Sequence, residues 1–168
     1  PEVVGEMAVP EPEGIIVFPG EFPLLKDDLE VIEFARANRI AADEIAAKGG
    51  PAAQYEAYRA LYRADVTLSN LQTQPIPADL EHVSARAFAA RDQLENQHRD
   101  FRVRYHVLMQ RKKYEEISVL VKDYLSRFSD DHNSWARDAI DRQRDLIDAG
   151  HVPSNSAELE IQPVVAPD

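Results

Sequence analysis

Apolar residues recur at spacings of three and four through the middle of the chain, as in helices that bury one face. The first predicted helix begins at Asp27-Asp28, whose carboxylates suit a helix N-terminus, and ends at Gly49-Gly50. Pro51 then stands at the first position of a second helix, so the two helices are predicted to form a tight αα-hairpin. The apolar stripe of the first helix consists of Val31, Phe34, Ala41 and Ile45.

A long third helix is predicted after the break QTQPIPAD, from about Leu80 to about Gln110, with Asp79 as its N-cap. Its apolar stripe consists of Leu80, Val83, Ala87, Ala90, Leu94, Phe101 and Leu108. The fourth helix is predicted to begin near Lys113, with a stripe of Tyr114, Ile117, Val121, Tyr124 and Phe128.

The fifth helix is predicted from about Trp135 to Gly150, because glycine suits the position after a helix and Pro153 forbids continuation. The middle of the chain shows no sustained period-two alternation, which is the pattern of half-buried strands. The predicted fold class is therefore all-α, with about five helices in a bundle or a stack of helical hairpins.

Proline marks both ends of the chain as extended arms, because eight of the 11 prolines lie in residues 1–23 or 153–168. The sequence thus divides into an acidic arm (1–26), a helical domain (27–150) and a C-terminal arm (151–168). Acidic arms of this kind cannot bury enough apolar surface to fold alone. Each nevertheless has an apolar patch, expected to lie on its own domain or on a neighbour: Ile15, Ile16, Val17 and Phe18 in one, and Leu159, Ile161, Val164 and Val165 in the other.

Charge and composition narrow the classes of function. The net charge of −11 repels phosphate backbones, so nucleic acid is not an expected partner. The chain has no cysteine, which excludes disulfides, thiolate metal sites and cysteine nucleophiles. No apolar run reaches the roughly 20 residues of a membrane span, so the protein is expected to be soluble, in the cytoplasm or within a particle.

The most basic segment of the chain runs from Arg99 to Lys113 and contains six cations and a single acid, Asp100. One interpretation is a surface patch for an acidic partner, the chain's own arms included. The alternative is a solvated helix face whose last cations offset the helix dipole. The cations are Arg99, Arg102, Arg104, Arg111, Lys112 and Lys113.

Tyr55, Tyr58 and Tyr62 share one face of the second helix, beside Arg59 and Arg63. Tyrosine and arginine are enriched in binding hot spots, which favours an exposed recognition ladder. The alternative is that the tyrosines cover a small core while their hydroxyls reach water.

Glu95 and His98 form the one metal-like motif, since residues three apart share a helix face as in di-iron carboxylate bundles. Those bundles need a second such motif and further glutamates. The alternative is a hydrogen-bonded core histidine, because His98 falls between Leu94 and Phe101 on the apolar stripe. The sequence contains no zinc-protease motif, phosphate-binding loop or nucleophile elbow, so neither an enzyme nor a cofactor is expected.

The stretch FRVRYHVLMQRKKYEEISVLVKDYLSRFSDD, with the helix after Trp135, resembles one tetratricopeptide repeat over about residues 101–149. Both have an aromatic residue that opens a helix, a basic break, a YEE motif, a second apolar helix and a polar turn. The family's small positions are filled here by Tyr105 and Ile117, and the proline at the repeat end is missing. The resemblance implies an adaptor with a protein-binding helical face.

The layout of the chain resembles the small helical head-completion and connector proteins of tailed phages. The resemblance rests on the N-terminal arm followed by FPLLKDDLEVIEFARANRI, the hairpin and PADLEHVSARAFAARDQL. It implies a virion component whose arms clasp adjacent subunits. The sequence as a whole thus predicts a non-enzymatic structural subunit that binds protein partners, identical subunits among them. A tetratricopeptide-like adaptor and a di-iron-like bundle enzyme are the alternatives.

Overall fold

The computed structural model describes residues 22–153, which form five α-helices, one short 3₁₀ helix and no strand. The helices are α1 (Asp28–Lys48), α2 (Ala53–Leu68), η1 (Ala78–Leu80), α3 (Val83–Gln110), α4 (Tyr114–Leu125) and α5 (Ser134–Asp148). The predicted all-α fold is confirmed for this part of the chain. The apolar patches at Ile15–Phe18 and Leu159–Val165 lie outside the described residues.

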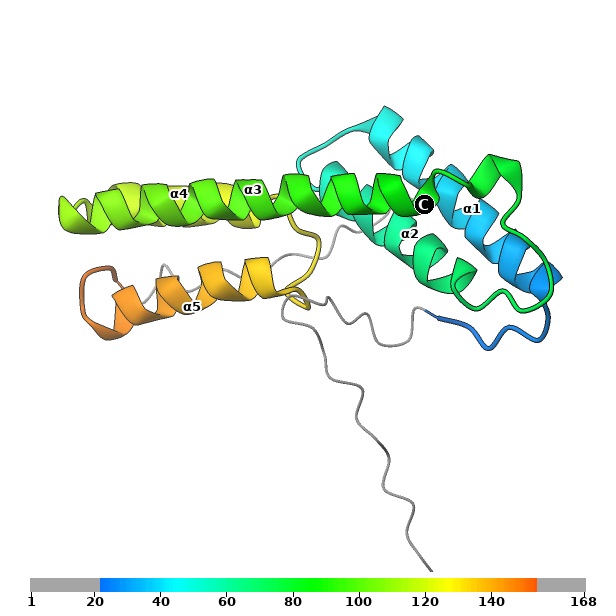
Figure 1. Cartoon of the computed structure of the whole chain (residues 1–168). Helices are drawn as coiled ribbons and strands as arrows, with labels where there is room; N and C mark the ends of the chain where they lie inside the picture. The colour runs from blue at the N-terminus through cyan, green and yellow to red at the C-terminus, as the bar shows by residue number, and fades with distance from the viewer. Residues whose placement is uncertain (1–21, 154–168) are drawn as a thin grey trace, which may run out of the picture.

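The 28-residue helix α3 connects the two halves of the fold. Figure 1 shows α2 packed at the N-terminal half of α3 with α1 beside α2, and α4 and α5 along the C-terminal half of α3. Both sets of partners cover one stripe of α3, formed by Val83, Ala87, Leu94, Phe101 and Tyr105. The opposite face of α3 is therefore left to solvent.

The predicted hairpin of α1 and α2 is present, with its helices close together because alanines line the contact. Asp27 caps α1 by accepting a hydrogen bond of 2.9 Å from the backbone N–H of Glu30. Gly49 ends α1 with a φ of 72°, in the region that favours glycine. The predicted stripe of α1 is wrong in register after Val31. The buried residues are Val31, Ile32, Ala35, Asn38 and Ala42, and they leave Phe34, Ala41 and Ile45 at the margins.

The start of α3 also differs from the prediction. The helix begins at Val83, and the residues before it form η1, which buries Leu80. Asp79 lies in η1 and does not cap α3. Its carboxylate instead accepts a hydrogen bond of 2.7 Å from Nε of Arg36 and so ties η1 to α1.

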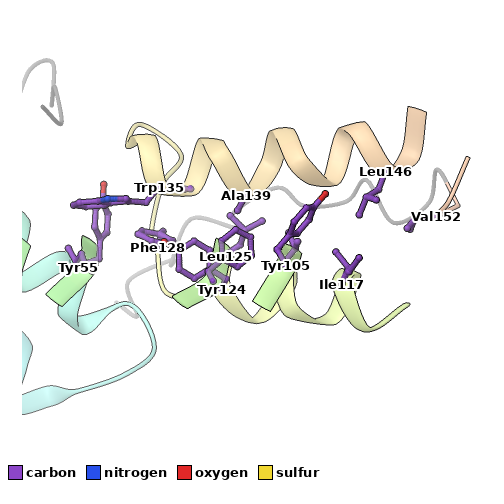
Figure 2. Packing of buried hydrophobic residues seen from close by; sticks show 14 of the residues in the cluster. Tyr55, Tyr105, Ile117, Tyr124, Leu125, Phe128, Trp135, Ala139, Leu146 and Val152 are labelled. Carbon is purple, nitrogen blue, oxygen red and sulfur yellow. The ribbon is translucent and has the colours of Figure 1, made fainter. Parts of the chain in front are cut away.

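The largest core cluster lies between α3, α4 and α5 and reaches α2 through Tyr55 and Tyr58. Figure 2 shows its aromatic and aliphatic side chains gathered between the ribbons of α4 and α5. The predicted stripe of the fourth helix is confirmed for Ile117, Val121, Tyr124 and Phe128, which are buried, whereas Tyr114 is half-buried at its start and Phe128 follows the end of α4. Packing continues beyond the predicted boundary at residue 150: Val152 is buried in this cluster, and the ring of His151 stacks on Tyr114 at 4.1 Å.

Asp130, in the loop between α4 and α5, joins this loop to α2. Its carboxylate accepts hydrogen bonds from the hydroxyl of Tyr55 at 2.9 Å and from Nη1 of Arg59 at 2.5 Å. Burial, and then the charge of Asp130, raise the pKa of Tyr55, so its hydroxyl stays protonated and donates. The backbone carbonyl of Asp130 accepts from Asn133, whose own side chain caps α5 at Ala136. One residue thus fixes the start of α5 relative to α2.

Replacement of Asp130 by Asn is predicted to lower the free energy of unfolding by about 2 kcal/mol. The amide has no charge and would direct one of its donors at Arg59 or Tyr55, leaving a partly buried donor unsatisfied. Urea unfolding measures the loss. The matched control is Asp131→Asn, because Asp131 is the exposed neighbour; it is predicted to change stability by less than about 0.5 kcal/mol. Equal stability of the two variants would contradict the role given to Asp130.

Candidate interaction surface

All six cations of the predicted basic segment are exposed. Arg99, Arg102 and Arg104 lie on α3, and Arg111, Lys112 and Lys113 form the turn to α4. Arg99 donates to Asn96 at 3.1 Å, and Lys113 pairs with Glu116 at 2.6 Å. Apart from Lys113, these cations form no ion pair with any residue from 22 to 153. We call this set of six residues the basic surface.

The turn at the end of α3 is a Schellman motif with a lysine in the position usual for glycine. The backbone N–H of Lys113 donates to the carbonyl of Leu108, and that of Lys112 donates to Met109, both at 3.0 Å. Lys112 has a φ of 55°, and it is the one residue other than glycine with positive φ among the described residues. Side chains in this region cost about 1–2 kcal/mol, which is the reason that glycine normally takes this place.

The same motif recurs at the end of α5 with the usual glycine. His151 donates its backbone N–H to Leu146 and Gly150 donates to Ile147, both at 2.9 Å, and Gly150 has a φ of 72°. The two turns lie against each other through the stacked rings of Tyr114 and His151. The chain therefore contains a matched pair of helix ends that differ in the residue at the strained position.

A shallow groove runs beside the basic surface between α3 and α5. Exposed Val103 and Val107 supply its apolar part, and neither belongs to the stripe that packs on the core. Three arginines supply cations along its rim. The lining residues are Glu95, His98, Arg99, Arg102, Val103, His106, Val107 and Arg142.

His98 connects α3 to α5 at one side of this groove. Its Nε2 lies 2.9 Å from Oδ2 of Asp138, and the same oxygen accepts a hydrogen bond of 2.9 Å from Nε of Arg142. Burial acts to raise the pKa of Asp138, but the hydrogen bonds from Arg142 and His98 outweigh it and hold that pKa below its usual range. The ring of His98 also stacks on Phe101 and Tyr124. The interpretation of His98 as a packed, hydrogen-bonded histidine describes this geometry.

The structure does not bring Glu95 and His98 together as metal ligands. Glu95 faces Arg91 at 3.8 Å, whereas His98 is engaged with Asp138. Among residues 22–153, no three His, Cys, Asp or Glu side chains lie close enough together to hold a metal ion. The described residues therefore do not fit the di-iron alternative, which needs several converging carboxylates.

The three tyrosines of α2 do not form an exposed ladder. Tyr55 and Tyr58 are buried in the main core cluster, and Tyr62 is half-buried against it. The rings of Tyr55 and Tyr58 pack on Phe128 and Trp135, respectively. The exposed-ladder interpretation is thus wrong for Tyr55 and Tyr58, because their face of α2 meets the loop between α4 and α5 rather than solvent.

Sequence reasoning missed two features of this surface. Val103 and Val107 lie four positions apart on α3, on a different face from Phe101 and Tyr105. Helical spacing could therefore have predicted that the two valines are exposed. The positive φ of Lys112 was not readable in this way, because no glycine or asparagine marks the position.

Comparison of the chain with protein-family models, with curated proteins and with solved structures finds no match. The resemblances to a tetratricopeptide repeat and to phage connector proteins therefore stay predictions. Within residues 22–153, no helix is both long enough and apolar enough to cross a membrane.

Exchange of the residues at the two helix ends tests the strain at Lys112. Lys112→Gly is predicted to raise the free energy of unfolding by about 0.5–1 kcal/mol, because glycine adopts positive φ without steric cost. Gly150→Lys is predicted to lower it by about 1 kcal/mol through the backbone alone, since a Cβ at Gly150 would meet no atom within 4 Å. Thermal or urea unfolding measures both. A Lys112→Gly variant no more stable than the original protein would show that this position is not strained.

The pair formed by Asp138 and His98 predicts a pH dependence of stability. A carboxyl whose pKa is lowered on folding stabilises the fold above its unfolded pKa of about 4 and loses this effect as the pH falls through the folded value. Asp138→Asn should therefore cost about 1–2 kcal/mol at pH 7, with a cost that shrinks below about pH 4. Asp141→Asn, an exposed change on the same helix, should cost less than about 0.5 kcal/mol at either pH. A cost of Asp138→Asn that is the same at pH 7 and pH 3 would refute the ionic role.

Proposed function

We propose that this chain is a non-enzymatic structural subunit of a larger protein assembly. It binds neighbouring subunits, copies of itself among them, through its acidic terminal arms and the basic surface at the end of α3. The observation that carries the proposal is the lysine at the strained position of the basic turn. The mechanism is charge pairing between an arm and the basic surface, together with burial of apolar arm residues such as Ile15–Phe18.

The strained lysine supports an interaction role. The same chain uses glycine at the matching end of α5, so the fold itself does not require a side chain there. A residue that weakens local structure without a compensating contact in its own fold points to a role outside that fold. Lys112 makes no ion pair with a described residue, and its charge therefore remains available to a partner.

The distribution of charge supports the arms as the complementary part. All 19 Lys and Arg residues lie within residues 22–153. Of the 30 acidic residues, five lie in residues 1–21 and three lie in residues 154–168, where no base accompanies them. Opposite charges on an arm and on a neighbour's surface direct association and fix its register.

Deletion of residues 1–21 tests the proposal and leaves every described contact in place. The intact protein is predicted to assemble to a mass well above that of the 19.0 kDa chain, and the deletion variant to a smaller species with the same helical circular dichroism. Analytical ultracentrifugation measures the masses. Assembly is also predicted to weaken as salt rises from 50 mM to 500 mM, because screening shortens the range of charge pairing. A deletion variant with unchanged mass would rule out the arm as the link between subunits.

A further inference from the structure

We propose that the groove between α3 and α5 is the docking site of the chain's own residues 158–165 in the isolated subunit. The segment reads ELEIQPVV and lies outside the described residues. The role of this docking rests on the proposed function. In that role, the C-terminal arm covers part of the interaction surface until a neighbouring subunit displaces it. The docking itself is independent of assembly.

The chemistry of the groove matches that of the segment. Val103 and Val107 provide an apolar strip, with exposed fractions of 59% and 37%. Arg99, Arg102 and Arg142 stand along it. Arg142 pairs with Asp138, whereas Arg99 and Arg102 form no ion pair with any described residue. The one acid of the lining, Glu95, lies at the far end and faces Arg91. An occupant with apolar side chains and carboxylates is therefore favoured.

The sequence ELEI supplies both kinds of side chain in alternation. In an extended backbone, successive side chains point to opposite sides, so Leu159 and Ile161 can face the valines while Glu158 and Glu160 face the rim. Val164 and Val165 continue the apolar character after Pro163, and a proline at this position does not suit a helix that runs through the whole segment.

The place at which the described chain ends puts this segment within reach. His151 stacks on Tyr114, and Val152 is buried, so the chain leaves the fold beside the C-terminal end of α3. Five extended residues from Pro153 to Glu158 span about 16 Å, and α3 from its last residue, Gln110, back to Val107 is about 5 Å long. Residues 158–165 extend about 23 Å, compared with about 18 Å along α3 from Val107 to Glu95. The length of the segment therefore permits docking within one chain.

Disulfide trapping tests the docking directly, because the chain contains no cysteine. Val103→Cys is combined in turn with Leu159→Cys, Ile161→Cys or Val164→Cys in the full-length protein at low micromolar concentration. In the matched control, the cysteine is placed at Val119, an exposed valine on the outer face of α4, instead of at Val103. At least one pair with Val103 is predicted to form an intramolecular disulfide on the order of tenfold faster than the pair with Val119.

Charge reversal tests the recognition by charge. Arg99→Glu with Arg102→Glu is predicted to slow the fastest of these cross-links on the order of tenfold, and Glu158→Arg with Glu160→Arg added to this variant should restore the rate. Equal rates for Val103 and Val119, cross-links only between different chains, or a rate unaffected by charge reversal would each overturn the proposal. A failure of this kind is separate from a failure of the proposed function, which is judged by the mass of the deletion variant.

Discussion

The carboxylate of Asp130 is the contact on which the relation between the two halves of the fold depends. Helical stripes determine which side of α3 each neighbour covers, but they leave the position of the loop between α4 and α5 open. Asp130 fixes the position of this loop. Its carboxylate accepts hydrogen bonds from Tyr55 and Arg59 of α2, and its backbone carbonyl accepts one from Asn133, the N-cap of α5. The second half of the fold is thereby anchored to the first. Because both halves pack on the same stripe of α3, the other face of this helix is exposed to solvent.

The order of the helices could be predicted from the sequence because local sequence patterns specify where each helix begins and ends. Turn glycines, caps and periodic apolar residues predicted all five helices, and the packed stripe from Ile117 to Phe128 came out as expected. The errors have tertiary causes. In α1 the contact with α2 selects alanines such as Ala35 over the larger Phe34, because small residues allow the helices to approach closely. Asp79 was assigned as a cap, yet an arginine from another helix holds it.

The candidate site was less predictable than the fold. The six cations are found where the sequence placed them, on exposed positions. Burial of Tyr55 and Tyr58 depends on a contact between residues 75 apart in the chain, which no local pattern reveals. The same holds for His98, whose partner Asp138 lies 40 residues away on α5. Tyr55 and His98 have the residue types of recognition or metal-ligand side chains, but in this structure they join helices to one another.

The proposed action of the protein is contact with neighbouring subunits, by way of its acidic arms and the basic surface. The measurement that tests it most directly is the mass of the native particle isolated from its source at low salt, by native mass spectrometry of the intact species. The account predicts a complex several times heavier than the 19.0 kDa chain, which releases this subunit as salt is raised. A lone chain of 19.0 kDa under these conditions would contradict it.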